Sequence, residues 1–287
     1  MAVTDNIVDL SVEVNPDFWE PEPVRREVLN HRDGADKLGQ SYLYFQAKGY
    51  WRKWWLKLLR PKRYCLDHQD FPDQMGLSLM TYNLTTHTGT HIDAPYHYGW
   101  RATTKTKPKT VTDIPLSWCY GNGVLLDFTD GDTSIDAAQV EAECRRIGYT
   151  IAQGDIVLMN TGAHRKVGTR EYFTRYKAID KSSIAWLIER GVRVIGTDAF
   201  SFDRPFCEMI DDYKKTGDKN VLWPAHFYGR DHEYIQIERL GNLDALPRST
   251  GFKVCCFPIK LTNADAAWSR VVAILDRDAD LIKLGAD

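Results

Sequence analysis

The chain has 287 residues, of which 43% are hydrophobic and 26% charged, and its formal net charge at pH 7 is −2. This near-neutral balance gives no reason to expect nucleic acid as a partner, and no apolar stretch approaches the ~20 residues needed to cross a bilayer. The opening MAVTDNIVDLSVEV lacks the basic start of a signal peptide, and the six cysteines contain no CxxC pair, so we expect a cytoplasmic protein with reduced, mostly buried cysteines.

Short runs rich in valine, isoleucine and aromatic residues predict β-strands, because glycine, asparagine or aspartate bounds them. These runs are residues 6–12, 123–128, 155–160, 192–198, 234–240, 253–259 and 270–275. Two helices are expected between them, one capped by Ser134 and running through Ile147, the other capped by Ser182 and ended by Gly191. Each helix leads into a strand, so the sequence predicts an α/β fold in a single domain over residues 1–287.

Residues 15–80 differ from the rest and are expected to form an insertion or lid within that domain. The stretch GYWRKWWLKLLRPKRY places apolar residues at the spacing of one helical face: Trp51, Trp54, Trp55, Leu58 and Leu59. Basic residues surround that face: Arg52, Lys53, Lys57 and Arg60.

Three interpretations of this helix remain open. It could lie on a membrane surface, line a pocket for an aromatic substrate, or pack on the body of the protein or on a second subunit. Packing is favoured because an apolar stripe usually marks it, and a helix at a subunit seam could also line a pocket.

The stretch HTGTHIDAPYH, residues 87–97, concentrates three of the eight histidines around one aspartate. A helix is disfavoured because threonine and glycine are poor helix formers and Pro95 would break the turn. In an extended strand, side chains alternate between faces, so His87, His91 and Asp93 would all point to the same side.

Two imidazoles and one carboxylate suit a catalytic divalent metal, since three protein ligands leave positions open for water. Gly89 on the same side would leave space for an ion or substrate, and His97 would approach from the loop that follows. We therefore predict a site for Zn²⁺, with Mn²⁺ as the alternative, because the spacing does not choose between these metals.

The histidine stretch resembles the HxGTHxDxPxH signature of the metal-dependent cyclase family, to which bacterial kynurenine formamidase and isatin hydrolase belong. GDIVLMNTG (154–162), GTDAFSFD (196–203) and AHFYGRDHEYIQIERLGNLDALP (225–247) are similar to further segments of that family, in the same order. The resemblance implies a swivelling β/β/α, cyclase-like domain with a mixed sheet. It also implies a homodimer or homotetramer in which a neighbour contributes to the pocket.

The resemblance also implies roles for individual residues. His87, His91 and Asp93 match metal ligands of the family. His97 and Glu238 match the groups that complete a second metal site in two-metal members, with Asp93 near both.

Proton transfer is assigned in the same way. His226 matches a histidine near the metal that is placed to move protons, and His97 is the other candidate for protonating the leaving group. Ser201 and Asp198 are expected either to orient water or substrate, or simply to cap a loop.

The sequence departs from the family at bulky positions. Phe200 stands where the family usually has proline, and Ala266 and Trp268 replace the glycine and proline of a D-G-x-P-x-R segment. These changes add aromatic bulk and remove no ligand.

The expected activity is attack of metal-activated water on a carbonyl, opening an amide or lactam C–N bond of an aromatic small molecule. One alternative is a natural-product (polyketide-type) cyclase or dehydratase that uses the same metal. The other is a non-enzymatic protein that binds a metal or a membrane.

Overall fold

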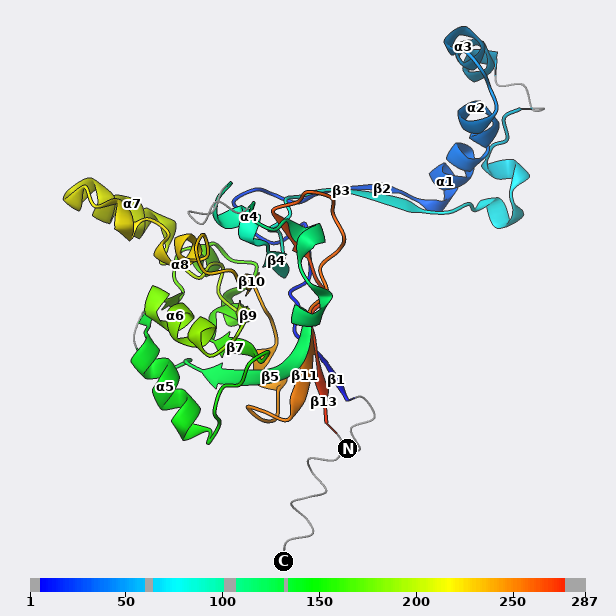
Figure 1. Cartoon of the computed structure of the whole chain (residues 1–287). Helices are drawn as coiled ribbons and strands as arrows, with labels where there is room; N and C mark the ends of the chain where they lie inside the picture. Colours follow the sequence, from blue (N-terminus) through cyan, green and yellow to red (C-terminus); the bar gives the residue numbers. More distant parts are fainter. Residues whose placement is uncertain (1–5, 60–63, 101–106, 132–133, 277–287) are drawn as a thin grey trace, which may run out of the picture. The chain divides into compact units, whose positions relative to one another are not determined.

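The computed structural model describes residues 6–59, 64–100, 107–131 and 134–276 (Figure 1). The chain divides into two compact units: residues Met1–Glu22 with Thr85–Asp287, called the body below, and residues Pro23–Leu84, called the arm. The arm corresponds approximately to the segment predicted as an insertion, and the organisation of the whole chain as one domain stays a prediction.

The centre of the body is a mixed sheet of nine strands, which confirms the predicted mixed α/β fold and includes all seven predicted strands. The strands follow one another across the sheet as β1 (Ile7–Asp9), β13 (Val272–Leu275), β11 (Phe252–Cys255), β5 (Tyr120–Asp127), β7 (Ile156–Asn160), β9 (Val194–Thr197), β10 (Ile235–Glu238), β4 (His91–Asp93) and β12 (Ala266–Trp268). The four strands from β5 to β10 run parallel, and the strands on either side pair antiparallel.

Both faces of the central strands are buried. On β7, Leu158 enters one hydrophobic cluster and its neighbour Val157 enters a different one, because successive side chains of a strand point to opposite faces. Helices α5 (Ala137–Arg146) and α6 (Lys181–Glu189) contribute side chains to the second cluster and lie together beside the parallel strands (Figure 1). Continuous apolar runs such as IVLMN are the sequence pattern of such doubly covered strands.

The two predicted helices are present, but aspartates cap them. The carboxylate of Asp136 accepts the N–H of Gln139 at 2.9 Å, whereas Ser134 lies in β6 (Ser134–Ile135), which pairs with β8 (Ala178–Ile179). Asp180 caps α6 by accepting the N–H of Ser182 at 2.8 Å. Both predicted serine caps are therefore wrong, because an aspartate with extended backbone directly precedes each helix.

The remaining helices of the body include two short ones that begin with proline, a residue well suited to the first helical turn. They are α4 (Pro95–Tyr98), α7 (Phe206–Thr216), α8 (Pro224–Tyr228) and the 3₁₀ turns η3 (Val111–Asp113), η4 (Leu116–Trp118), η5 (Ala163–Lys166), η6 (Arg170–Phe173), η7 (Lys219–Val221) and η8 (Leu243–Ala245). His97 lies in α4 and His226 in α8, so two candidate site residues are carried by these short helices.

The arm consists of a two-stranded ribbon and a group of helices between its strands. Its elements are β2 (Arg25–Leu29), α1 (His31–Leu38), α2 (Ser41–Phe45), α3 (Tyr50–Leu59), η1 (His68–Asp70), η2 (Pro72–Gln74) and β3 (Leu79–Asn83). No helix among the described residues is both long and apolar enough to cross a membrane.

Helix α3 confirms the predicted amphipathic segment, although Arg60 lies outside the described residues. Trp51, Trp54 and Trp55 are 72%, 46% and 53% exposed. The apolar face of α3 is therefore exposed within the arm, and packing on the body or on a second subunit stays a prediction.

Candidate metal centre

The predicted extended strand over the histidine stretch is only partly present. His91 and Asp93 lie in β4, but His87 precedes it in a turn where Gly89 has φ +68°. The turn still brings Nδ1 of His87 to 3.1 Å from Nε2 of His91, while Nδ1 of His91 lies 2.9 Å from the carbonyl oxygen of Gly89. The glycine thus allows a left-handed turn, rather than leaving space for an ion as predicted.

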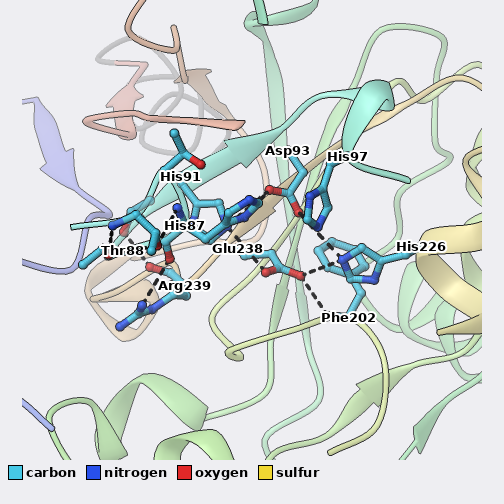
Figure 2. Close-up of polar contacts among 12 residues, drawn as sticks. His87, Thr88, His91, Asp93, His97, Phe202, His226, Glu238 and Arg239 are labelled. Atoms are coloured by element: carbon cyan, nitrogen blue, oxygen red, sulfur yellow. Dashed lines mark hydrogen bonds and ion pairs between the residues drawn. The ribbon is translucent and has the colours of Figure 1, made fainter. Parts of the chain in front are cut away.

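Asp93 occupies the middle of a cluster of imidazoles and is fully buried (Figure 2). Its Oδ1 lies 3.0 Å from Nδ1 of His87 and 3.3 Å from Nε2 of His91. Its Oδ2 lies 3.8 Å from Nε2 of His226 and 4.0 Å from Nε2 of His97. Neither oxygen has a hydrogen-bond partner among the described residues, which is costly for a buried carboxylate unless a cation compensates it.

Three groups of these side chains offer ligand atoms that lie within 4.8 Å of one another. The groups are His87, His91 and Asp93; Asp93, His97 and His226; and His87, His97 and Asp265. The first group is the predicted triad, which the fold brings together as the sequence suggested. Nitrogen and carboxylate donors around an unpartnered buried carboxylate fit a divalent metal ion, and the identity of each ligand stays a prediction.

Glu238 joins the cluster through the register of the sheet. Strand β10 pairs antiparallel with β4, which places Glu238 directly opposite His91. Its Oε2 lies 3.6 Å from Nε2 of His91, and its Oε1 lies 3.6 Å from Nε2 of His226. Burial and the negative charge of Asp93 raise the pKa of Glu238 to about 7.

Asp203 orients His226 from outside the cluster. One oxygen of Asp203 accepts the backbone N–H of Ala225 at 2.7 Å, and the other lies 2.6 Å from Nδ1 of His226. The ring is thereby fixed with Nε2 toward Asp93 and Glu238. Burial lowers the pKa of His226, but its interactions with Asp203, Asp93 and Glu238 together more than offset this, and the pKa is raised.

Asp265 acts in the same way on two other imidazoles. Its Oδ2 lies 3.0 Å from Nε2 of His87 and 3.4 Å from Nδ1 of His97, and its Oδ1 accepts the N–H of Ala266 at 2.9 Å. A carboxylate on the outer nitrogen of an imidazole sets its tautomer and directs its other nitrogen inward. Hydrogen bonding to His87 lowers the pKa of Asp265, so this carboxylate stays charged.

Neither Asp203 nor Asp265 was predicted as a site residue. Asp203 lies in GTDAFSFD, a segment noted for its similarity to the family. Asp265 lies in the stretch noted for its departure from D-G-x-P-x-R. Asp203 ends the first of these segments and Asp265 begins the second; this was the only signal, since the partner histidines are distant in sequence.

The predicted catalytic Ser201 is buried, and its hydroxyl has no hydrogen-bond partner among the described residues. The structure records no contact between this described serine and the imidazoles, so its role stays a prediction. Asp198, by contrast, accepts the N–H and hydroxyl of Thr161 at 2.8 and 2.6 Å and contacts Nδ1 of His164 at 2.8 Å, which supports the loop-capping interpretation.

The departures from the family pattern have structural consequences. The indole N–H of Trp268 donates to the carbonyl of Thr85 at 3.0 Å and so holds the turn that leads to His87. Phe200 and His87 both line a pocket of about 660 Å³. Two other pockets of similar volume, about 640 and 670 Å³, contain none of the clustered histidines.

These features define a mixed α/β protein with a buried histidine and carboxylate centre that could hold a metal, next to a pocket of small-molecule size. The chain belongs to the Cyclase family, whose sequence model matches residues 8–204. It is 28% identical over 201 residues to the kynurenine formamidase of Salinibacter ruber (70% of this chain, 81% of the relative) and 26% identical over 200 residues to that of Bordetella pertussis (63% and 88%).

Solved structures of similar fold include isatin hydrolases. An isatin hydrolase bound to the product analogue thioisatinate has a TM-score of 0.66 at 16% identity, covering 94% of this chain and 92% of its own. Isatin hydrolase A from Ralstonia solanacearum gives 0.66 at 21% identity with the same coverage. The cyclase-like fold expected from the sequence is thus confirmed, while its swivelling character stays a prediction.

Substituting the buried His91 tests the metal centre. We expect His91→Ala to reduce bound divalent metal from about one ion per chain to a small fraction while the far-ultraviolet circular dichroism stays unchanged, because the triad loses a ligand. Metal content by mass spectrometry and the spectrum provide the readouts. His232→Ala, at an exposed histidine stacked on Tyr228, is the matched control. Undiminished metal binding in His91→Ala would refute the assignment.

Asp265→Asn tests the outer carboxylate. We expect metal affinity to fall about 10–100-fold, because the uncharged amide no longer orients His87 and His97 as a carboxylate does. Competition with a chromophoric chelator measures the affinity. Asp9→Asn is the control: Asp9 lies on β1 and pairs with Arg270, so its substitution should leave the metal affinity unaltered. Equal affinity in wild type and Asp265→Asn would show that Asp265 has no influence on the centre.

Proposed function

We propose that the protein is a metal-dependent hydrolase that opens an amide or lactam C–N bond of an aromatic small molecule. The observation that carries this proposal is Asp93, a fully buried carboxylate whose oxygens lack hydrogen-bond partners among the described residues but lie within 4.0 Å of four imidazole nitrogens. Membership of the Cyclase family and the relationship to kynurenine formamidases support the reaction class.

His87, His91 and Asp93 would hold the ion, and His97 and Glu238 would complete a second site if two ions bind. Zn²⁺ is the proposed metal and Mn²⁺ the alternative, because mixed imidazole and carboxylate donors suit both. Bound there, the cation would polarise a carbonyl and lower the pKa of a bound water to about 7.

Residues of the chain itself would transfer the proton that the leaving group needs. Asp203 holds His226 so that Nε2 lies 3.6 Å from Oε1 of Glu238 and 3.8 Å from Oδ2 of Asp93. This nitrogen can pass a proton to the departing nitrogen of an amide, and Glu238 can exchange a proton with it. His97, whose side chain is 31% exposed, is the second candidate donor.

Ser201 would contact the substrate. Its hydroxyl is buried and lacks a hydrogen-bond partner among the described residues, so it is available to donate to a substrate oxygen or to orient water. The pocket at His87 supports a small-molecule substrate, because its volume of about 660 Å³ lies within the usual 300–1,000 Å³.

Hydrolysis is tested by incubating the metal-loaded protein with isatin and with N-formylkynurenine and following absorbance. We expect hydrolysis of at least one, and a loss of at least ~100-fold in kcat/KM for His226→Ala, because proton transfer contributes about 10²–10⁴-fold. Absence of turnover on both compounds, with metal bound stoichiometrically, would contradict the proposal. It would favour the ring-closing alternative, which the added aromatic bulk at Phe200 supports.

We also propose that the protein is a homodimer or homotetramer in which the arm packs on a second copy. An isolated two-stranded ribbon is at best marginally stable in water, and β2 and β3 leave residues such as Val28 and Met80 more than half exposed. Leu58 and Leu59 of α3 are also exposed, and contiguous apolar surface of this kind usually marks an interface.

Sedimentation velocity tests the assembly. We expect a dimer or tetramer in the wild type and a shift toward monomer in Trp51→Glu/Leu58→Glu, because the charges oppose burial of this face. Leu116→Glu, at a body residue that is 68% exposed, is the control and should leave the distribution unchanged. A monomeric wild type that floats with anionic vesicles would instead support the membrane interpretation of α3.

A further inference from the structure

Two cysteines of the body lie opposite each other, outside the candidate metal centre. Strands β5 and β11 pair antiparallel with Tyr120 opposite Cys255, and the same register places Cys119 opposite Cys256, one residue beyond the paired strands. The backbone N–H of Cys256 donates to the carbonyl of Cys119 at 2.9 Å, so the register continues to this pair. The sheet therefore brings together two cysteines that are 137 residues apart in the chain.

The two thiols share one environment. Both cysteines are fully buried and belong to the same hydrophobic cluster. The Sγ atom of Cys256 lies 3.5 Å from the carbonyl oxygen of Cys119. Hydrogen bonding between the two thiols lowers the pKa of Cys119 and, together with burial, raises the pKa of Cys256.

The backbone geometry of such a pair suits a disulfide. Residues directly opposite on antiparallel strands have Cα atoms about 4.5–5.5 Å apart, and the Cα atoms of disulfide-bonded cysteines are about 4.4–6.8 Å apart. Joining Cys119 to Cys256 therefore requires no rearrangement of the sheet.

The other cysteines lack this arrangement. Cys255 precedes Cys256 but points to the opposite face, because successive side chains of a strand alternate. Cys144 is buried in a different hydrophobic cluster, Cys207 is exposed, and Cys65 lies in the arm. A single buried cysteine usually behaves as an inert apolar residue, so the facing pair is what distinguishes Cys256 from these.

The pair lies near the surface although its own side chains are covered. Tyr120 and Phe257, the residues that follow the two cysteines, are 49% and 45% exposed. The end of a sheet ladder opens locally at a lower free energy than its centre. A molecule as small as hydrogen peroxide can therefore reach the two thiols without global unfolding.

We propose that Cys119 and Cys256 form a reversible disulfide when the protein is exposed to a peroxide. The thiolate of Cys119 attacks one oxygen of hydrogen peroxide, which breaks the O–O bond and gives a sulfenic acid. The departing hydroxide takes up the proton that Cys119 gave up and becomes water. The sulfur of Cys256 then displaces the sulfenic hydroxyl, which leaves with the thiol proton of Cys256 as a second water. The two sulfurs lose two electrons to the peroxide, and a dithiol reverses the oxidation.

The disulfide fastens two segments that are hydrogen-bonded at both ends. Cys256 and Cys119 form one end, and at the other the N–H of Val111 donates to the carbonyl of Ala264 at 3.0 Å. Asp265, an orienting carboxylate of the candidate centre, follows Ala264 directly. The disulfide therefore stabilises the base of the segment that carries Asp265, and it forms whether or not the protein is a hydrolase.

Peptide mapping tests the link. The full-length protein is reduced, freed of reductant, treated with hydrogen peroxide while folded, alkylated and digested without reduction. We expect mass spectrometry to find a peptide joined to Cys119, and dithiothreitol to remove the link. Because Cys255 and Cys256 are adjacent, two variants assign the partner: Cys256→Ser should abolish the link, and Cys255→Ser should keep it.

The proposal is overturned if the folded wild type gives no link to Cys119, or if Cys119 is oxidised to a sulfinic acid without a link. A link that persists in Cys256→Ser and disappears in Cys255→Ser would overturn it as well. The wild-type map gives its answer whether or not either variant folds.

Thermal unfolding tests the effect of the link. We expect the Tm of the oxidised wild type to lie about 4–10 °C above that of the same protein after dithiothreitol, because a disulfide that closes a long loop restrains the unfolded chain. Cys256→Ser, treated with peroxide in the same way, is the matched control and should show no rise. Equal Tm values for the linked and the reduced wild type would contradict the stabilising role.

Discussion

The structure of the candidate centre depends on the burial of one negative charge, the carboxylate of Asp93. A buried carboxylate without hydrogen bonds is unfavourable by itself, and the surrounding fold supplies imidazoles rather than the usual amide or hydroxyl donors. Imidazoles can donate a hydrogen bond or ligate an ion, whereas amide N–H groups can only donate. The imidazoles around Asp93 therefore favour a metal centre over a structural ion pair as the explanation of this buried charge.

Strands β10 and β12 and helix α8 assemble around Asp93 of strand β4, and they are fixed in two different ways. Strand β4 receives hydrogen bonds from β10 on one side and β12 on the other, which sets the positions of Glu238 and of the segment leading from Asp265. His226 is set by a short helix whose first N–H groups bind Asp203. The site thus combines a rigid sheet with outer carboxylates that orient the imidazoles. Metal-binding histidines typically have such a partner on the ring nitrogen that does not face the metal.

The parts of this structure that could be predicted from sequence are those specified by local pattern. Apolar runs such as residues 155–160 identified the strands, and the spacing of the tryptophans identified α3. The conformation of His87 was predicted wrongly, because an alternating pattern does not reveal that Gly89 adopts a left-handed turn. Asp203 and Asp265 were missed because their function arises from contacts with histidines 23 and 178 residues away in the chain.

Strand β4 is only three residues long and has a partner on each side. Because side chains of a strand alternate, adding or deleting one residue before Ile92 would exchange the inward and outward faces of the whole segment. Ile92, now in the hydrophobic core, would then face the imidazoles, and a histidine and an aspartate would be driven into that core. Any change in the length of this segment should consequently displace His91 and Asp93 together.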